Sequence, residues 1–399
     1  MKSLFGAGVA LATMLASAAF AAEKKYDQGA SDTEIRIGQT VPYSGPASYG
    51  GTIGRIQVPY FEDLNARGGI NGRKVKLISL DDAYSPPKTV EATRRLVESD
   101  GVLATWFSMG TAPQVAVQKY LFSKKVPQLM VSTGSPHWNE PKKFPLTVSA
   151  LGLYSTEARA FGRWLTGHKP DAKVAILYQN DDLGREYVAD FKKALGDKGK
   201  GMIVAEASYD ITDPTIDSQL VKLANSGADV FYNVTVGKFV SQSLRKTSEL
   251  GWKPLHYLVG VSTSRPLLKA AGFENARGLR SLVYIRQPTD AEWQNDPLVK
   301  EYQAFRAKHT PTVDPGDAVG FMAWGGARML EELLKRCGDN LTRENMMTQL
   351  KGMSGYAPAH FLPGVTFEIS ADDYEPVRTF FFAEFNGETW VRGKEPVNR

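Results

Sequence analysis

The chain has 399 residues, of which 42% are hydrophobic and 23% are charged, and its formal net charge is +5. This length exceeds what one hydrophobic core usually supports, so we expect two domains. Acidic and basic side chains alternate, as in Glu91-Ala-Thr-Arg94-Arg95, which is typical of solvated helix faces and argues against nucleic-acid binding. A single cysteine, Cys337, excludes an internal disulfide.

The first 21 residues have the pattern of a secretory signal peptide. Lys2 precedes an uncharged, mostly apolar stretch over 4–20, and Ala19-Phe20-Ala21 is a small-x-small motif before Glu23. A membrane anchor is the alternative, but the apolar stretch is short and polar sequence follows at once. We therefore expect cleavage near Ala21 and release of the chain into the periplasm. No later stretch is long and apolar enough to cross a membrane.

From residue 34 onward, apolar patterning alternates between the periods of strands and helices. In the first half the pattern predicts strands over 34–38, 74–80, 102–107 and 127–131, and helices over 52–66, 87–99 and 112–122. The pair Gly68-Gly69 ends the first of these helices.

A second alternating series begins after residue 150. It predicts helices over 154–166, 185–195, 216–225 and 238–250, and strands over 173–178, 202–207, 229–234 and 255–259. Two long helices, 298–308 and 317–336, and a strand pair, 377–385 and 389–392, follow. Alternation of this kind indicates right-handed βαβ units and parallel sheets. Two series therefore predict an α/β protein with two such sheets.

Ligands in open α/β sheets lie beyond the carboxyl ends of the strands, so these ends are the candidate site. Ser108-Met-Gly110-Thr111 ends one predicted strand and opens a helix, and a hydroxyl beside free helix-start amides suits a carboxylate. Ser132 to Ser135 is a second group of donors, and Tyr49-Gly50-Gly51 adds an aromatic face. The alternative interpretation is that these residues only cap helices and form turns.

Motifs for catalysis are not found in the sequence. The five histidines lack the close spacing of a metal site, and there is no phosphate-binding loop, Gly-x-Ser-x-Gly elbow or dinucleotide fingerprint after the first strand. The pairs Asp81-Asp82 and Asp181-Asp182 are more typical of turn capping than of acid–base chemistry. We therefore expect a binding protein that is not an enzyme and has no cofactor and no metal site.

Several motifs together carry a family resemblance. They are Ile35-Arg-Ile-Gly38, Ser44-Gly45-Pro46, Asn65-Ala-Arg-Gly68-Gly69-Ile70-Asn71-Gly72, Leu80-Asp81-Asp82, Ser108 to Thr111 and Val131 to Ser135. With these motifs the sequence resembles the periplasmic solute-binding proteins of ABC transporters, in the branched-chain amino acid-binding (leucine/isoleucine/valine-binding) family.

The resemblance implies a two-lobed type I periplasmic binding protein fold. Each lobe is then a parallel sheet flanked by helices, three hinge crossings join the lobes, and ligand is held between them. Lobe 1 is expected over 31–150 plus 286–364, and lobe 2 over 151–285 plus 365–399. The expected partners are a small organic ligand and the ABC permease subunits of the inner membrane. Nucleic acid is not an expected partner, and a monomer is expected.

The resemblance also assigns roles to individual residues. Ser108 matches the family's carboxylate-binding serine, and Gly134 and Ser135 match its donor loop. Tyr49 matches an aromatic residue of the pocket, and Tyr154, just after the first crossing, is expected to line the cleft. Thr111, at the start of the helix after Ser108, completes this half of the site.

Departures from the family bear on the ligand. Ser262 stands where the amino acid binders have the glutamate that pairs with the ligand's ammonium, and Leu183 and Thr235 replace two tyrosines. A buried ammonium without a carboxylate partner is costly. We therefore predict an aromatic or aliphatic carboxylate without an α-amino group, with Arg265 as a candidate second anion contact. Alternatives are a branched-chain amino acid or small amide paired with Asp181, or a ligand-sensing module that signals to a receptor.

Overall fold

The computed structural model describes residues 24–398. The predicted signal peptide lies outside these residues. Within the described part of the chain, no helix combines the length and the apolar character needed to cross a membrane.

The first sheet has five strands, and all its pairings are parallel. Its order is β3 (Lys74–Asp81), β2 (Glu34–Val41), β4 (Ala104–Trp106), β5 (Gln128–Val131) and β6 (Thr147–Ser149). The strands β4, β5 and β6 are fully buried, as expected where helices cover both faces of a parallel sheet. The connecting helices are α1 (Thr52–Ala66), α2 (Pro86–Arg94) and α3 (Thr111–Ser123).

The second sheet has seven strands in the order β14 (Trp390–Asn398), β13 (Thr379–Phe385), β11 (Arg280–Val283), β10 (Leu255–Leu258), β9 (Val230–Val234), β7 (Val174–Gln179) and β8 (Ile203–Tyr209). Five of these strands are parallel, and β13 and β14 add an antiparallel edge. The helices of this series are α4 (Tyr154–His168), α5 (Asp182–Leu195), α6 (Gly199–Met202), α7 (Asp217–Ala224), α8 (Lys238–Glu249), α9 (Arg265–Ala271) and α10 (Phe273–Ala276).

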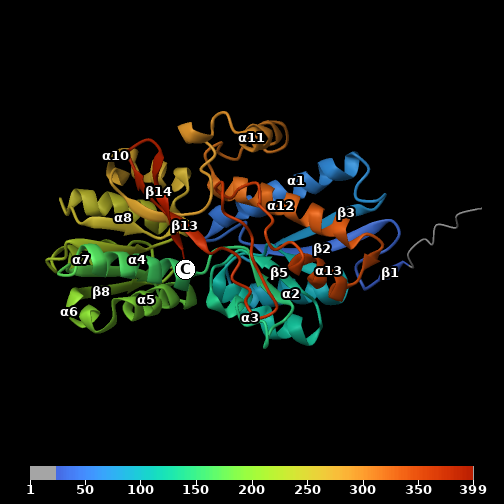
Figure 1. Cartoon of the computed structure of the whole chain (residues 1–399), viewed down its shortest axis with the longest axis horizontal. Coiled ribbons are helices and arrows are strands. Elements are labelled where there is room, and N and C mark those ends of the chain that lie inside the picture. The colour runs from blue at the N-terminus through green and yellow to red at the C-terminus, as the bar shows by residue number, and fades with distance from the viewer. Residues whose placement is uncertain (1–23, 399) are drawn as a thin grey trace, which may run out of the picture.

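The chain passes between the two sheets three times: after β6, after β11 and before β13. Between the last two passages it forms α11 (Pro297–His309), α12 (Ala318–Cys337) and α13 (Arg343–Lys351), and α12 packs on α1. A short parallel pair, β1 (Lys25–Tyr26) and β12 (Asn340–Leu341), ties the first described residues to this region. The two sheets with their helices lie side by side along the long axis of the molecule, and β13 and β14 return to the second sheet (Figure 1).

Most elements match their sequence predictions to within a few residues. The exceptions include β11, α9 and α13, which the sequence analysis missed. The strand β11 has only four residues and lacks alternation, so no periodic signal marks it. The two sheets agree with the two predicted series, whereas the residue boundaries of the lobes stay a prediction.

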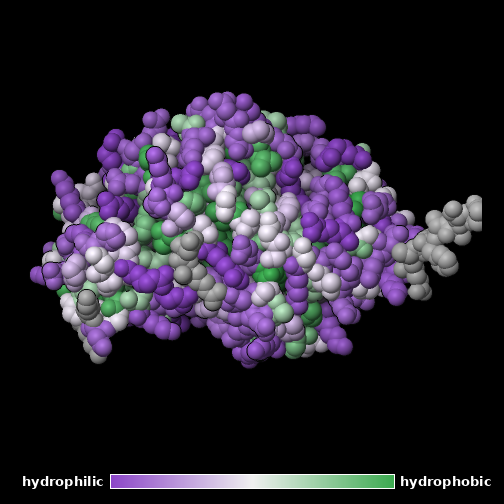
Figure 2. All heavy atoms as spheres, in the orientation of Figure 1, coloured by the Kyte–Doolittle hydropathy of each residue, from purple (hydrophilic) through white to green (hydrophobic). Residues whose placement is uncertain are grey.

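The described surface in one view is mostly hydrophilic, and hydrophobic residues come to the surface mainly near its middle, where the two halves meet (Figure 2). Inside, aromatic rings fill the second half: Phe161 stacks on Tyr257 with ring centroids 3.8 Å apart. In the first half α12 approaches the sheet closely at a glycine. A Cβ on Gly326 would lie 2.4 Å from the ring of Phe107.

This close approach generates a prediction. Gly326→Ala overpacks the contact with Phe107 and should lower the free energy of unfolding by about 1–3 kcal/mol, despite the better helix propensity of alanine. Gly167→Ala is the matched control, because Gly167 is also helical but has no neighbour within 4 Å of an added Cβ. That variant should be neutral or more stable. Urea unfolding measures both, and equal effects would contradict the packing argument.

Candidate functional site

A cavity lies between the two sheets, at the carboxyl ends of their strands. It is lined from the first half by residues after β2, β3, β4 and β5, from the second half by residues after β7, β9, β10 and β11, and by the start of α12. Its volume of about 90 Å³ corresponds to roughly six to nine waters. Covalently bonded atoms lie closer together than separate waters, so a solute of about ten non-hydrogen atoms fits.

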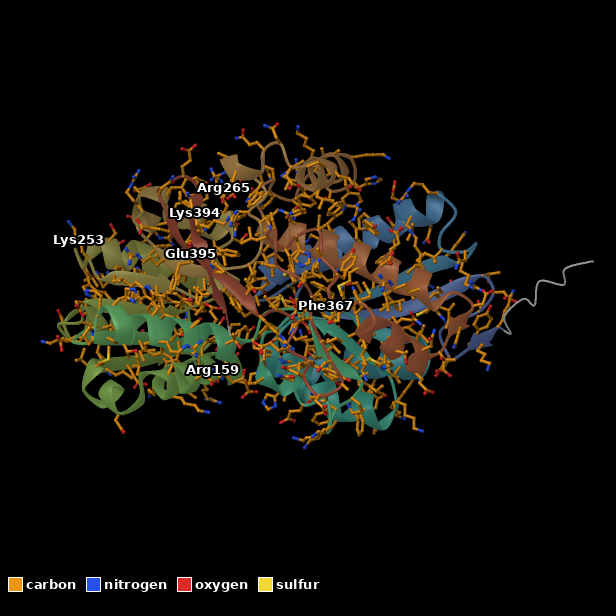
Figure 3. The ribbon with its side chains drawn as sticks, viewed as in Figure 1. Arg159, Lys253, Arg265, Phe367, Lys394 and Glu395 are labelled. Atoms are coloured by element: carbon orange, nitrogen blue, oxygen red, sulfur yellow. The ribbon has the colours of Figure 1, made fainter. Side chains whose placement is uncertain are left out.

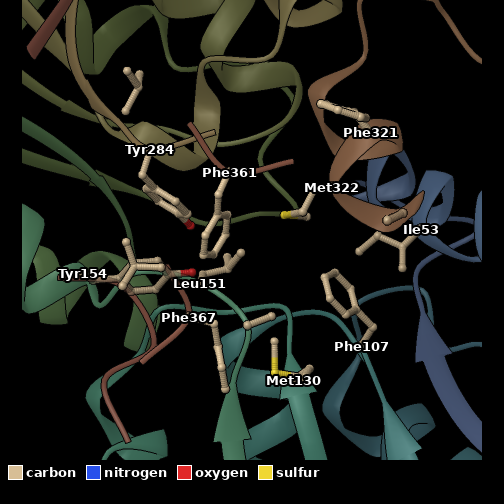
Figure 4. Close-up of a cluster of buried hydrophobic side chains, with 14 of the residues drawn as sticks. Ile53, Phe107, Met130, Leu151, Tyr154, Tyr284, Phe321, Met322, Phe361 and Phe367 are labelled. Atoms are coloured by element: carbon tan, nitrogen blue, oxygen red, sulfur yellow. The ribbon is translucent and has the colours of Figure 1, made fainter. Parts of the chain in front are cut away.

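The cavity wall is uncharged. Among the described residues that line it there is no Asp, Glu, Lys, Arg or His. Aliphatic side chains and four tyrosines make up much of the wall, namely Tyr49, Tyr84, Tyr154 and Tyr284. Figure 4 shows Leu151, Tyr154, Tyr284 and Met322 converging from different segments, with the hydroxyl ends of Tyr154 and Tyr284 directed towards the middle of this cluster.

One end of the cavity is polar because helix α3 begins there. Gly110 precedes the helix with φ of 106°, and a Cβ at this position would lie 2.6 Å from the ring of Tyr84, so glycine lets the helix start reach the cavity. Pro113 has no N–H and Gln114 N donates to Gly110 O (3.2 Å), so the amides of Thr111 and Ala112 have no partner within the helix, and of these two residues Thr111 lines the cavity. The N-terminus of a helix with free amides favours the binding of an anion.

Hydroxyl groups surround this helix start. Ser132 lines the cavity, and Thr111 Oγ1 lies 2.7 Å from Thr133 Oγ1. Thr133 Oγ1 donates to the hydroxyl of Tyr154 (3.3 Å), so the proton of Tyr154 is available to an acceptor in the cavity. The ring of Tyr154 is fixed by stacking on Tyr187, with centroids 4.5 Å apart.

The structure brings three of the eight sequence-predicted site residues to the cavity, namely Tyr49, Thr111 and Tyr154. Ser108 is not part of the wall: its Oγ accepts a hydrogen bond from Thr40 N (3.0 Å) and joins β2 to the end of β4. Gly134, Ser135, Thr235 and Ser262 also lie behind the wall. Since no ligand contact is known for any of the eight, their ligand-binding roles stay predictions.

Gly134 and Ser135 lie behind Tyr154. Gly134 O accepts from Tyr154 N (2.7 Å), and a Cβ on Gly134 would lie 2.6 Å from the Tyr154 ring, so this glycine sets the position of the ring. Ser135 Oγ donates to Glu186 Oε1 on α5 (2.8 Å). This hydrogen bond joins a segment of the first half to a helix of the second. Both residues therefore support the site from outside in this structure.

Thr235 and Ser262 are paired with each other beside the second sheet. Ser262 Oγ donates to Thr235 O (2.6 Å), and both residues are buried outside the cavity wall. Of the other candidates, Leu183 lines the cavity. Arg265 does not: it donates to Glu388 O and stacks over Phe273 near the outer end of β14 (Figure 3). It is therefore not a second anion contact in this structure.

Asp181 lies close to the cavity but is occupied as a helix cap. Its carboxylate accepts from Gln179 Nε2 (2.5 Å) and from Gly184 N at the start of α5 (3.3 Å). Burial raises the pKa of Asp181 above its usual value. It is not among the residues of the wall.

Several residues of the wall were missed by the sequence analysis. Tyr84 follows the strand β3, and the rule of strand carboxyl ends could have found it. Tyr284 and Gln287 lie in the second crossing, and Ala318, Val319 and Met322 begin a helix far along the chain. No local pattern marks these five, because only the packing of the two halves brings them together.

A buried carboxylate holds part of the wall in place. Glu157 on α4 accepts hydrogen bonds from Gly260 N (2.8 Å), Tyr257 Oη (2.9 Å) and Tyr187 Oη (2.7 Å). Burial raises the pKa of Glu157 to about 7, although these donors act in the opposite direction. Gly260 lines the cavity, so Glu157 positions the wall without contacting its interior.

Two α/β halves that enclose an uncharged cavity between their strand ends define a solute-binding protein. The chain matches the sequence model of the periplasmic binding protein family over residues 34–389, and it belongs to that family. The family consists of solute-binding proteins, not enzymes. Proteins of this family bind small-molecule ligands and deliver them to ABC transporter permeases.

Individual relatives are distant. The chain is 26% identical to "Leu/Ile/Val-binding protein homolog 3" of Brucella melitensis biotype 1, over 82% of this chain and 85% of the relative. A branched-chain amino acid ABC transporter protein from Thermus thermophilus with bound valine has a TM-score of 0.83 at 18% identity and covers 93% and 98% of the two chains. A solute-binding protein from R. palustris in complex with benzoate has a TM-score of 0.75 at 21% identity and covers 91% and 96%. Identities this low show the shared type I fold and not the ligand.

The pKa of Glu157 generates a prediction about stability. A folded-state pKa of about 7, above the ordinary 4.5, means that the contribution of Glu157 is full below pH 4.5 and is lost as the pH rises through 7. Glu157→Gln cannot titrate, so the wild type should lose up to about 3 kcal/mol relative to this variant between pH 4.5 and 8. Thermal unfolding across pH measures the difference. The exposed Glu249→Gln serves as control, and a difference independent of pH in Glu157→Gln would overturn the assignment.

Proposed function

We propose that this protein binds a small organic carboxylate, aromatic or aliphatic, that lacks an α-amino group, and delivers it to an ABC importer. The observation that carries the proposal is the composition of the cavity wall. Its polar end offers the helix start at Thr111 and the hydroxyls of Ser132 and Tyr154, whereas no described residue of the wall is charged. A carboxylate is stabilised there by charge-assisted hydrogen bonds and by the helix dipole.

The size and the tyrosines of the cavity support a compact, flat or branched acid. A solute of about ten non-hydrogen atoms corresponds to a single-ring or short-chain carboxylate, and tyrosine faces pack well against rings. The structural relative from R. palustris is in complex with benzoate, an acid of this kind.

A branched-chain amino acid or small amide is the alternative, favoured by the valine-bound relative and by the names of the sequence relatives. An α-ammonium in this cavity would be buried without an anionic partner in the wall, which is costly. The sequence analysis named Asp181 as a partner for such an ammonium. Its two carboxylate oxygens, however, already accept hydrogen bonds from Gln179 and Gly184. The wall therefore favours the acid over the amino acid.

Delivery would follow the mode of the family. The two halves, with lobe 1 over 31–150 plus 286–364 and lobe 2 over 151–285 plus 365–399, would close about the three crossings, and the closed form would dock as a monomer on the permease. Secretion with cleavage near Ala21 would place the chain in the periplasm. A sensory role, in which the closed form engages a receptor, is the second candidate, because it would use the same closure.

The proposal predicts the outcome of a ligand screen. The chain, refolded to remove carried-over ligand, is heated with benzoate, octanoate, leucine and valine in separate samples. A ligand at about one hundred times its Kd should stabilise the fold by roughly 2.7 kcal/mol, which raises the Tm by several degrees. Stabilisation by an acid and not by the amino acids is the expected result. Stabilisation by leucine or valine alone would overturn the proposed ligand class.

Tyr154→Phe tests the polar end of the cavity in the same assay. Loss of the hydroxyl should weaken binding of the carboxylate about tenfold or more, since the hydrogen bond is to a charged group. Tyr178→Phe, on β7 and outside the cavity wall, is the matched control and should bind as the wild type does. Titration calorimetry measures both. Unchanged affinity in Tyr154→Phe would remove this hydroxyl from the site.

A further inference from the structure

Ser264 forms hydrogen bonds from one half of the protein to the other at the cavity wall. It follows β10 of the second sheet, and both Ser264 and Ala318 line the cavity. Ser264 Oγ donates to Asp317 Oδ1 (3.0 Å) and accepts from Ala318 N (3.2 Å) at the start of α12, the helix that packs on α1 of the first half. One hydroxyl group thus joins two sides of the wall.

The two hydroxyl residues that precede Ser264 bond within the second half. Ser262 Oγ donates to Thr235 O (2.6 Å), and Thr263 Oγ1 donates to Gly260 O (2.9 Å). Ser264 also stands at the N-cap of its own helix, α9, but its side chain makes no capping hydrogen bond there. Serine is favoured at an N-cap because its hydroxyl can bond the amides of its own helix. In this chain the hydroxyl caps a helix of the other half instead.

The start of α12 accommodates this hydroxyl closely. Asp317 Oδ1 caps its own helix by accepting from Val319 N (3.0 Å), and the amide of Ala318 donates to the serine. The residue before the cap is Gly316, where a Cβ would lie 2.7 Å from Cδ of Arg265, the next residue along the chain from the serine. Glycine therefore lets the two segments approach each other at this point.

Movement of the two halves apart would break both hydrogen bonds of the serine. We propose that Ser264 is a latch of the closed form: its hydrogen bonds to Asp317 and Ala318 form on closure and strengthen the binding of any solute that the cavity holds. The inference rests on the closure proposed above and not on the ligand class. Apparent affinity falls with the fraction of the binding-competent form, so a latch that raises this fraction strengthens binding.

Removal of the hydroxyl tests the latch through binding. Benzoate, octanoate, leucine and valine are titrated calorimetrically into the wild type and into Ser264→Ala. Each solute that binds the wild type should bind the variant about tenfold more weakly, because one of the lost hydrogen bonds is to a carboxylate, and by the same factor for each. Stopped-flow measurement should show the loss as faster release.

Ser241→Ala is the matched control. The hydroxyl of Ser241 donates to Lys238 O within α8, outside the cavity wall, so this variant should bind as the wild type does. Thermal unfolding without ligand verifies that each variant is folded. Unchanged affinity in Ser264→Ala would overturn the latch, and weaker binding of one solute but not of another would show a direct ligand contact instead. Binding of leucine or valine alone would overturn the proposed ligand class, while the same comparison with that amino acid would still decide the latch.

A cross-link tests the movement without any ligand. In the double variant Ser264→Cys and Ala318→Cys an oxidant should form a disulfide, since the hydrogen bond between these residues brings their backbones close together. The wild type, whose Cys337 is buried, is the oxidation control. Small-angle X-ray scattering should give a smaller radius of gyration for the oxidised variant than for the reduced one. Equal radii, or absence of the cross-link, would overturn the latch.

Discussion

The site depends on one constraint, namely that the carboxyl ends of two parallel sheets enclose the same cavity. Parallel strands carry their helix starts and turns at one edge, and three chain crossings hold the two edges together. The wall is therefore assembled from short pieces of many elements, and no single segment supplies it. Tyr154 and Tyr284, which belong to two of the crossings, contribute rings to the same wall and are buried.

Acidic and basic residues are excluded from the wall, but two titratable carboxyl groups lie immediately behind it. Glu157 is buried and Glu186 is half-buried; their hydrogen bonds hold Gly260 and Ser135, and desolvation raises the pKa of the two groups to about 7 and about 8 respectively. Neutral hydrogen-bonding groups thus face the solute, while titratable groups fix the loops that present them. For the proposed carboxylate ligand, the helix start and the hydroxyls of the wall would provide the stabilising hydrogen bonds without a counterion.

Family membership and ligand identity are supported by different evidence. The fold is shared with proteins bound to valine and to benzoate at about one-fifth sequence identity, so the scaffold admits both kinds of solute. In this chain the polar groups of the wall include the α3 start, Ser132 and Tyr154. The polar groups of the wall, and not the fold, therefore carry the information about the ligand class.

The sequence by itself determined the architecture. The alternation of strand-like and helix-like segments marked most of the strands and helices, because the pattern of apolar residues is local to each segment. The ends of the predicted strands marked Tyr49 and Thr111, and the family resemblance marked Tyr154. Only the tertiary structure decided which hydroxyls face the cavity: Ser108, Ser135 and Ser262 have the right composition and position in the chain, but each is turned towards a partner inside the protein. Gln287 and the start of α12 carry no local signal, since their place in the wall arises from contacts between segments far apart in the chain.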